Sequence, residues 1–541
     1  MLLSACARPG AKPLAPTTSG TTPPTTTTTT PASLFAASDR GIALIYTASV
    51  QGYVEPCGCT GDPLGGIARF KAVIDDARRA FGERVLVVDG GDLLFEKATD
   101  NGAVDRCQAE ARTELLVSTY ARSGLVATTR GPLDDVRGAS FRDALLRKHA
   151  VPSLEHGQSL TVNRGGHRLL IVGVDDKDDP ALVDAAVARG KHDAVIVLAQ
   201  MSFKDALARA AKWKTVDVVV VGRAAEAPVA PQQAGRAVVV SAGWQAQYAG
   251  VLTLHLDGRI PGVPLALEDR ASVEARKKLL DVRLLELDRL LASLPAGVQK
   301  DFQAQRRATF AQERAALEAG GDVVVTGARI VVQAVPLKRG MSEETQAQQE
   351  LAFYERSIPA LVGKCEQGVT CPEPGADQAV FVGAATCKAC HAAAYDTWQK
   401  ALVDVVATNK DGSKTTHKSG HSQAWPTLVK AGRDKDRSCV ACHAAGFDVA
   451  GGACTTTVLV EKQLTGVQCE SCHGAGSLHV QGGGDVSKIR RVVDEATCRG
   501  CHLPPHIETA AAFVYEERML LILGPGHQRR SLPAGTSAQA R

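Results

Sequence analysis

The chain has 541 residues, which is too long for one hydrophobic core and predicts two or three domains. Its 62 basic and 58 acidic side chains nearly balance, so the composition argues against a nucleic-acid or other polyanionic partner. No stretch has the length and apolar character of a membrane-spanning helix.

The first 38 residues predict an anchor and a tether. The segment Leu3-Ser4-Ala5-Cys6 resembles a bacterial lipobox, whose cysteine receives a lipid after cleavage. The charged and apolar regions that normally precede this box are missing, so we interpret residues 1–6 as a remnant lipoprotein signal that follows a misplaced start codon. The alternative is an ordinary cysteine in a frayed terminus. Residues 7–38 are expected to form a disordered tether, because 17–30 are nearly all Thr, Pro, Ser and Gly.

Alternating strands and helices predict an α/β domain over residues 39–262. Strand-like apolar runs occur at 42–46, 85–88, 169–174, 194–198, 216–221, 237–240 and 251–256. Helix-patterned segments occur at 67–81, 110–121, 181–188 and 204–212. Such alternation is typical of layered folds in which helices cover a sheet.

Three segments of this domain resemble the periplasmic 5′-nucleotidase branch of the calcineurin-like metallophosphoesterases. They are Tyr46-Thr47-Ala48-Ser49-Val50-Gln51-Gly52, Gly65-Gly66-Ile67-Ala68-Arg69 and Val88-Asp89-Gly90-Gly91-Asp92. The resemblance implies a metallophosphoesterase-like α/β sandwich.

Most metal ligands of that family are replaced in this chain. Ser49 and Gln51 stand where the family has Asp and His, and only Asp92 remains of the direct ligands. The other departures are Pro132-Leu133 for Asn-His, Ala199-Gln200 for Ser-His and Gly222-Arg223-Ala224-Ala225 for Gly-His-x-His. Two-metal catalysis needs cations about 3.5–4 Å apart, which one carboxylate cannot hold. We therefore expect a degenerate domain without hydrolase activity or a bound divalent metal, in which Asp92 is structural.

Cys57 and Cys59 flank a glycine just after the first strand, near the expected position of the lost metals. A Cys-x-Cys pair can be a redox couple, a soft-metal site or two halves of other disulfides. The pair resembles the branch of these nucleotidase-like proteins that contains cysteine or selenocysteine. The alternative to thiol redox chemistry is a structural role, with Cys107 as one pairing partner.

Residues 263–362 predict a helical connector. Leu280, Leu284, Leu287, Leu291 and Leu294 repeat at intervals of four and three, as in a short coiled-coil seam within a core or dimer. A second helix at 299–319 is expected to fold back as a hairpin. A strand pair at 323–335 and a helix at 343–361 follow.

Three further cysteines lie near or within the last region of the chain. We expect Cys365 and Cys371 to form a disulfide around a glycine-containing loop. No partner is assigned to Cys454.

Four Cys-x-x-Cys-His motifs, the attachment signature of c-type haem, define a domain over residues 363–527. The attachment cysteines are Cys387, Cys390, Cys439, Cys442, Cys469, Cys472, Cys498 and Cys501, and the proximal iron ligands are His391, His443, His473 and His502. Two thiols three residues apart lie on one side of a helical turn, and the following His can reach the iron. Zinc binding is the alternative, but a zinc ribbon does not need this His four times. Residues 528–541 are expected to be a disordered tail.

Five more histidines in this region are candidate distal ligands: His417, His421, His479, His506 and His527. Low-spin haems in electron-transfer proteins commonly use a second strong axial ligand. Surface histidines are the alternative, yet the first 361 residues contain only five histidines.

The haem region also resembles the tetrahaem cytochromes of the ammonia-oxidation type. The similar segments include Val382-Gly383, Trp398, His421-Ser422-Gln423-Ala424, and 466–474 through His479-Val480. The resemblance implies a mostly helical and loop-rich domain in which His421 and His479 are distal ligands, followed by His527. The roles of His417 and His506 stay open, and such families often leave one haem five-coordinate.

The main interpretation is an extracytoplasmic cytochrome that transfers electrons through four covalent haems and is fused to a phosphoesterase-like domain without its metal ligands. It is expected in the periplasm or at the outer membrane or cell surface, held by a lipid on Cys6. A redox protein or a quinone-linked donor or acceptor is the expected partner. One alternative is a redox enzyme that uses an open haem or the Cys57/Cys59 pair; another is a metal-dependent phosphoesterase.

Overall fold

The computed structural model describes residues 34–35, 40–56, 64–96, 105–259, 263–269, 298–318, 328–408, 414–502 and 513–523, with isolated positions between 277 and 291. The chain divides into two units, Met1–Ser33 and Leu34–Arg541, and all described residues belong to the second. Cys6 and the expected tail therefore lie outside the described residues, as does most of the expected tether.

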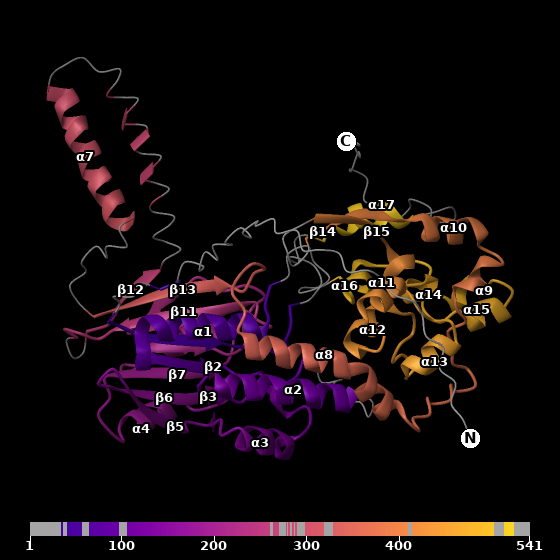
Figure 1. Ribbon diagram of the computed structural model, residues 1–541, viewed down its shortest axis with the longest axis horizontal. Helices are drawn as coiled ribbons and strands as arrows, with labels where there is room; N and C mark the ends of the chain where they lie inside the picture. Colours follow the sequence, from indigo (N-terminus) through magenta and orange to yellow (C-terminus); the bar gives the residue numbers. More distant parts are fainter. Residues whose placement is uncertain are drawn as a thin grey trace, which may run out of the picture. The chain divides into compact units, whose positions relative to one another are not determined.

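Two β-sheets form the centre of the N-terminal part (Figure 1). The first sheet has the strand order β12-β13-β11-β1-β2-β3-β4, and the second has the order β5-β6-β7-β8-β10-β9. The first sheet consists of β1 Ile42–Thr47, β2 Val85–Asp89, β3 Leu125–Thr129, β4 Ser153–Leu154, β11 Tyr248–His255, β12 Ala266–Asp269 and β13 Arg329–Pro336. The second consists of β5 Ser159–Arg164, β6 His167–Asp175, β7 Ala194–Gln200, β8 Val218–Val221, β9 Gln232–Ala234 and β10 Ala237–Val240.

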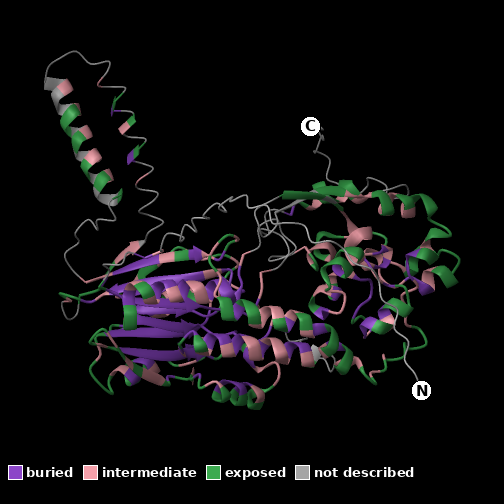
Figure 2. Cartoon of the chain, viewed as in Figure 1, coloured by how far each residue is buried: buried purple, intermediate pink, exposed green. Residues whose placement is uncertain are grey.

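The side chains of β1 show how the layers are built. Leu44 and Tyr46 pack between the two sheets, whereas Ala43 and Ile45 face the helices outside the first sheet. Successive side chains of a strand point to opposite faces, so a strand that is covered on both sides is apolar throughout. Figure 2 shows these central strands as the most continuously buried part of the chain.

Helices cover the outer face of each sheet and complete a four-layer α/β sandwich. The first sheet packs against α1 Ile67–Phe81, α2 Asp105–Arg122, α3 Ala139–Lys148 and α8 Thr345–Glu366. The second packs against α4 Ala181–Val187 and α5 Phe203–Ala210. Short 3₁₀ turns lie at η1 Gly82–Arg84 and η3 Pro132–Asp135. The α/β layering predicted from the sequence is confirmed.

The first sheet extends beyond residue 262, where we expected the α/β domain to end. Both β12 and β13 come from the expected connector, and β13 pairs with β11 and β12. The prediction of a strand pair at 323–335 is wrong in its described part, because 329–336 form one strand whose neighbours come from elsewhere in the chain. Tyr354, Ile358 and Val362 of α8 also belong to the core of the sandwich.

The hairpin expected in the connector is partly described. Its second helix is α7 Val298–Glu318. Arg307 and Arg314 of α7 bind Asp288 and Asp281 with closest distances of 2.5 and 2.7 Å, so α7 lies against the preceding segment. Leu280 and Leu287 of the predicted leucine seam are buried.

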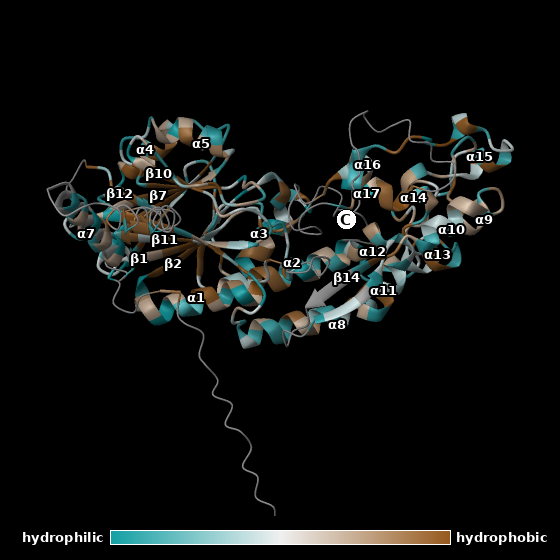
Figure 3. Ribbon diagram, turned by 90° about the horizontal axis from the view of Figure 1, so that it is seen from above, coloured by the Kyte–Doolittle hydropathy of each residue, from teal (hydrophilic) through white to brown (hydrophobic). Residues whose placement is uncertain are grey.

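The haem region consists of short helices and one hairpin. Its helices are α9 Ala384–Lys388, α10 Ala392–Lys400, α11 Ala424–Ala431, α12 Arg437–His443, α13 Thr456–Glu461, α14 Cys469–His473, α15 Ser477–Gln481, α16 Glu495–Arg499 and α17 Tyr515–Ile522. The remaining elements are η4 His421–Gln423, η5 Val486–Lys488, β14 Val403–Thr408 and β15 Lys414–Ser419. Figure 3 shows hydrophobic residues concentrated in the strands of the sandwich, whereas these short helices mix polar and apolar residues.

The disulfides differ from the expected pairing. Cys107 of α2 pairs with Cys365 of α8, and Cys371 pairs with Cys454. The predicted Cys365–Cys371 bond is therefore wrong, and Cys107 is not a partner of the Cys57/Cys59 pair. The physical reason is packing: α8 runs against α2 in the same helical layer, which brings Cys365 to Cys107.

None of the helices within the described ranges combines the length and the apolar character that crossing a bilayer requires.

Candidate haem sites and a buried polar cluster

Each haem motif lies on or at the end of a short helical segment. The second and third motifs end α12 and form α14, while Cys387 and Cys498 lie in α9 and α16. The amide of His391 donates to the carbonyl of Cys387, and that of His502 to Cys498, both at 2.9 Å. These bonds close one helical turn, the geometry that places two cysteines and a histidine on one side. The two disulfides use none of the eight motif cysteines.

Three histidines have their rings oriented through Nδ1. The Nδ1 atoms of His443, His473 and His479 lie 2.8, 2.7 and 2.9 Å from the carbonyl oxygens of Ala424, Arg490 and Asp485, respectively. An Nδ1–H that donates to a carbonyl leaves Nε2 with its lone pair, as a metal ligand needs. The donor set therefore fits iron ligation through Nε2.

Two candidate distal histidines lie beside motif histidines. The ring centres of His391 and His479 are 6.2 Å apart with an angle of 19° between the planes, and those of His421 and His502 are 6.1 Å apart with 47°. A metal–imidazole bond is about 2 Å and a ring centre lies about 1 Å from its nitrogen, so two rings on opposite faces of one metal are separated by about 6 Å. Both pairs fit this separation. Burial lowers the pKa of His421, which favours the neutral ring that a metal requires.

Glu470, inside the third motif, joins the first motif to the third. Its carboxylate accepts hydrogen bonds from the amides of Val382 and Gly383, at 3.0 and 2.7 Å, and of Gly476 at 2.8 Å. Gln468 accepts a bond from Ala384 N at 2.6 Å in the same place. We did not predict this role, because Glu470 in the sequence looks like an ordinary surface acid, yet it is only 2% exposed.

The remaining predicted residues are not placed by the structure. His506, His527, Cys57 and Cys59 lie outside the described residues. His417 lies on β15, paired in register with Val405 of β14, and its side chain is outside the described set.

In the sandwich, the residues at the positions of the family's metal ligands bind one another. Asp92 accepts a hydrogen bond from Gln200 Nε2 at 2.6 Å and another from Leu133 N at 2.8 Å. Ser49 Oγ donates to the carbonyl of Gly222 at 2.8 Å. Ser49 and Asp92 both have positive φ angles, 47° and 53°, which is uncommon away from glycine and asparagine. The side chain of Asp92 is thus bonded to Gln200 and to the amide of Leu133, and that of Ser49 to the carbonyl of Gly222.

Two further carboxyl groups complete this buried polar cluster. Asp134 accepts bonds from the amides of Asp92, Leu94 and Gly131, at 2.8–2.9 Å. Asp89 accepts from the hydroxyls of Thr47 and Thr128. Burial raises the pKa of Asp134 to about 8 and that of Asp89 to about 7. It raises the pKa of Asp92 too.

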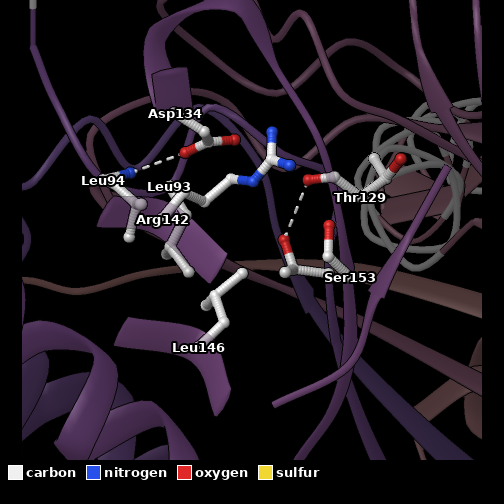
Figure 4. A pocket seen from close by; sticks show the side chains of 8 residues that line it. Leu93, Leu94, Thr129, Asp134, Arg142, Leu146 and Ser153 are labelled. Atoms are coloured by element: carbon white, nitrogen blue, oxygen red, sulfur yellow. Dashed lines mark hydrogen bonds between the residues drawn. The ribbon is translucent and has the colours of Figure 1, made fainter. Parts of the chain in front are cut away.

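A crevice beside this cluster is lined by Leu93, Leu94, Thr128, Thr129, Asp134, Arg142, Leu146 and Ser153. Figure 4 shows the carboxyl group of Asp134 at its edge, bonded to the amide of Leu94. The side chains leave no room for a ligand. Among the described residues, the grouping with metal-ligand spacing is His156, Asp175 and Asp178, which includes no member of the polar cluster.

Comparison with known proteins places the haem region. Residues 386–474 match the model of the family described as cytochrome c554 and c-prime. The match falls on three of the four motifs. Cytochrome c-554 of Nitrosomonas europaea is 33% identical over 112 residues, which cover 19% of this chain and 41% of that protein. The chain thus spans about two fifths of this relative's length, and the match implies covalently bound haem and supports a multihaem c-type cytochrome role.

Solved structures with a similar arrangement are nucleotidase-like proteins. They include a sulfate thiohydrolase, SoxB, from Thermus thermophilus in complex with glycerol, with 13% identity, coverage of 64% of this chain and 63% of that chain, and a TM-score of 0.40. A 5′-nucleotidase precursor, also from Thermus thermophilus, has 14% identity, coverage of 63% and 61%, and a TM-score of 0.38. These scores show a general likeness only.

Proposed function

We propose that this protein is an extracytoplasmic electron carrier with four covalently bound haems, fused to a phosphoesterase-like sandwich that lacks its metal ligands. The observation that carries the proposal is the spacing of the two imidazole pairs, His391 with His479 and His421 with His502. Each pair joins a motif histidine to a histidine from another element, at a separation that fits one iron.

The residues of this chain would attach, orient and shield the cofactor. The eight motif cysteines would form the thioether bonds, and the four motif histidines would be proximal ligands. Bound haem supplies a one-electron iron couple. Carbonyl oxygens at Ala424, Arg490 and Asp485 fix the rings of His443, His473 and His479, so the ligand planes are set by the backbone.

The setting and partners follow from the same proposal. Covalent haem attachment takes place outside the cytoplasm, and two disulfides are compatible with an oxidising compartment. The periplasm or the cell surface is the proposed location, with a lipid on Cys6 as the anchor. A redox protein or a quinone-linked enzyme is the proposed donor or acceptor.

A redox enzyme is a second candidate, and one contact favours it. Glu55, two residues before Cys57, binds Arg433 through both carboxylate oxygens. Arg433 in turn binds Asp436, which caps the helix of the second haem motif. Glu55, the described residue nearest in sequence to the Cys57/Cys59 pair but one, is thus joined to the start of the helix that carries that motif.

Haem stoichiometry tests the main proposal. Protein matured with the c-type haem machinery is expected to give four haems per chain in a pyridine haemochrome assay. The double variant Cys439→Ala, Cys442→Ala is expected to give three, because one site loses both thioether bonds. Ser487→Ala, an exposed substitution between the third and fourth motifs, is the matched control. Colourless protein, or zinc in place of iron, would contradict the proposal.

A further inference from the structure

A helix of the sandwich completes the cap of the helix that carries the second haem motif. Gln108, near the start of α2, donates from Nε2 to Asp436 Oδ1 at 2.5 Å and accepts from the amide of Arg437 at 3.1 Å. Asp436 is the N-cap of α12 and also accepts from Ser438 N at 3.1 Å. Gln108 is 5% exposed and Asp436 1%. One buried side-chain amide thus satisfies two polar groups at the start of α12.

Arg433 adds an ionic contact at the same place. It donates to both oxygens of Glu55 in the sandwich and, from Nη2, to Asp436 Oδ2 at 2.5 Å. A bidentate arginine–carboxylate pair has a defined geometry, because the planar guanidinium matches the two oxygens. Asp436 is therefore held by Gln108 through one carboxylate oxygen and by Arg433 through the other.

Arg437, the residue after Asp436, joins α12 to the last residue of α8. Arg437 is 5% exposed, and its guanidinium donates to Glu366 at 3.1 Å and to Asp448 at 2.6 Å. Buried ion pairs add little net stability, but removing one partner is costly. Such contacts consequently define where α12 lies more than they stabilise it.

We propose that Gln108 is a positioning residue for the second haem, acting through Asp436 and α12, and that the sandwich thereby sets the reduction potential of that haem. The inference rests on the proposed attachment of haem at Cys439, Cys442 and His443. The potential of a haem depends on its axial ligand, on burial and on nearby hydrogen bonds and charges. A displacement of α12 would alter the bond between His443 Nδ1 and the carbonyl of Ala424 and so move the imidazole that would hold the iron.

The isosteric change Gln108→Glu tests this inference in the full-length, haem-loaded protein. It replaces the donating amide with a carboxylate that faces Asp436, so the cap loses a hydrogen bond and gains repulsion. Potentiometric titration of the visible spectrum is expected to show one of the four one-electron waves shifted and three unchanged. His443→Met identifies the wave of the second haem, because it exchanges that proximal ligand. Gln349→Ala, on the exposed face of α8, is the control.

A double variant separates positioning from general destabilisation. Combining Gln108→Glu with Asp436→Asn exchanges the carboxylate and the amide across the contact, and is expected to return the shifted wave toward its original potential. A Gln108→Glu protein with four haems and the same titration as the Gln349→Ala control would overturn the inference. Absence of haem from the unmodified protein would instead overturn the proposed function.

Discussion

The sandwich and the haem region are held together in different ways. In the sandwich, continuous apolar strands such as β7 and β8 are buried on both faces, and large clusters of aliphatic side chains fill the layers. In the haem region, one small described cluster around Val440, Leu459 and Leu464 is accompanied by polar contacts at the ends of short helices. The first region encodes its fold in hydrophobic pattern, and the second in the spacing of cysteines, histidines and capping residues.

A substitution that creates a cavity in the sandwich is expected to have the largest effect on stability, and it sharpens this comparison. Leu198 of β7 is fully buried between the sheets. Leu198→Ala is expected to lower the free energy of unfolding by about 2–5 kcal/mol, because it removes apolar contacts and leaves a void. Thermal unfolding followed by far-UV circular dichroism measures this loss. Val263→Ala, at a half-exposed site, is expected to change stability by less than about 0.5 kcal/mol.

The stability of the haem region should depend instead on one buried carboxylate, that of Glu470. Glu470→Gln is expected to cost about 1.5–3 kcal/mol, since hydrogen bonds to a charged group are of that order and three amides depend on it. The loss should appear in melting followed by haem absorbance and leave the unfolding of the sandwich strands unchanged. Glu461→Gln, at an exposed position on α13, is the control. Equal effects of the two changes would contradict the role given to Glu470.

The two regions should also differ in pH dependence. In the folded sandwich, burial raises the pKa of Asp89 to about 7 and that of Asp134 to about 8, above the value of about 4 in an unfolded chain. The folded state therefore binds these protons more tightly. The stability that this proton binding contributes to the folded state is fully present below pH about 4 and is lost as the pH rises through about 7–8. The unfolding temperature of the sandwich is expected to be lower at pH 9 than at pH 5.

Asp436, beside the second haem motif, has the opposite behaviour. Burial alone would raise its pKa, but Arg433, Ser438 and Gln108 outweigh burial and leave the pKa below its ordinary value. Its contribution to stability is present above pH about 4 and is lost in more acidic solution. Melting followed by haem absorbance between pH 3 and 7 tests this expectation. A melting temperature that rises on acidification would contradict it.

The smallest expected effect concerns hydrolysis. With added manganese, the protein is expected to show no phosphodiesterase activity, because Asp92 is already bonded to Gln200 and Leu133. Asp92→Ala should therefore give the same flat assay. Manganese-dependent hydrolysis that disappears in Asp92→Ala would show that the sandwich retains a metal site and would contradict the expectation of a degenerate domain.

The sequence predicted those features that depend on local pattern. The strand predicted at 194–198 is a run of apolar residues, and the four haem motifs are defined by fixed spacing, so both could be recognised without the fold. The bond between Cys107 and Cys365 joins residues 258 positions apart, and only the packing of α8 on α2 brings them together. The roles of Gln108 and Glu470 were missed for the same reason, because each depends on a distant segment.

The two disulfides have a consequence for proteolysis. Cys107–Cys365 closes one covalent loop and Cys371–Cys454 closes the next, with only the peptide bonds between Cys365 and Cys371 outside both loops. A protease that cuts once anywhere else between Cys107 and Cys454 yields two polypeptides that remain joined until a reductant is added. A single nick inside either loop would thus leave all four haem motifs attached to the sandwich.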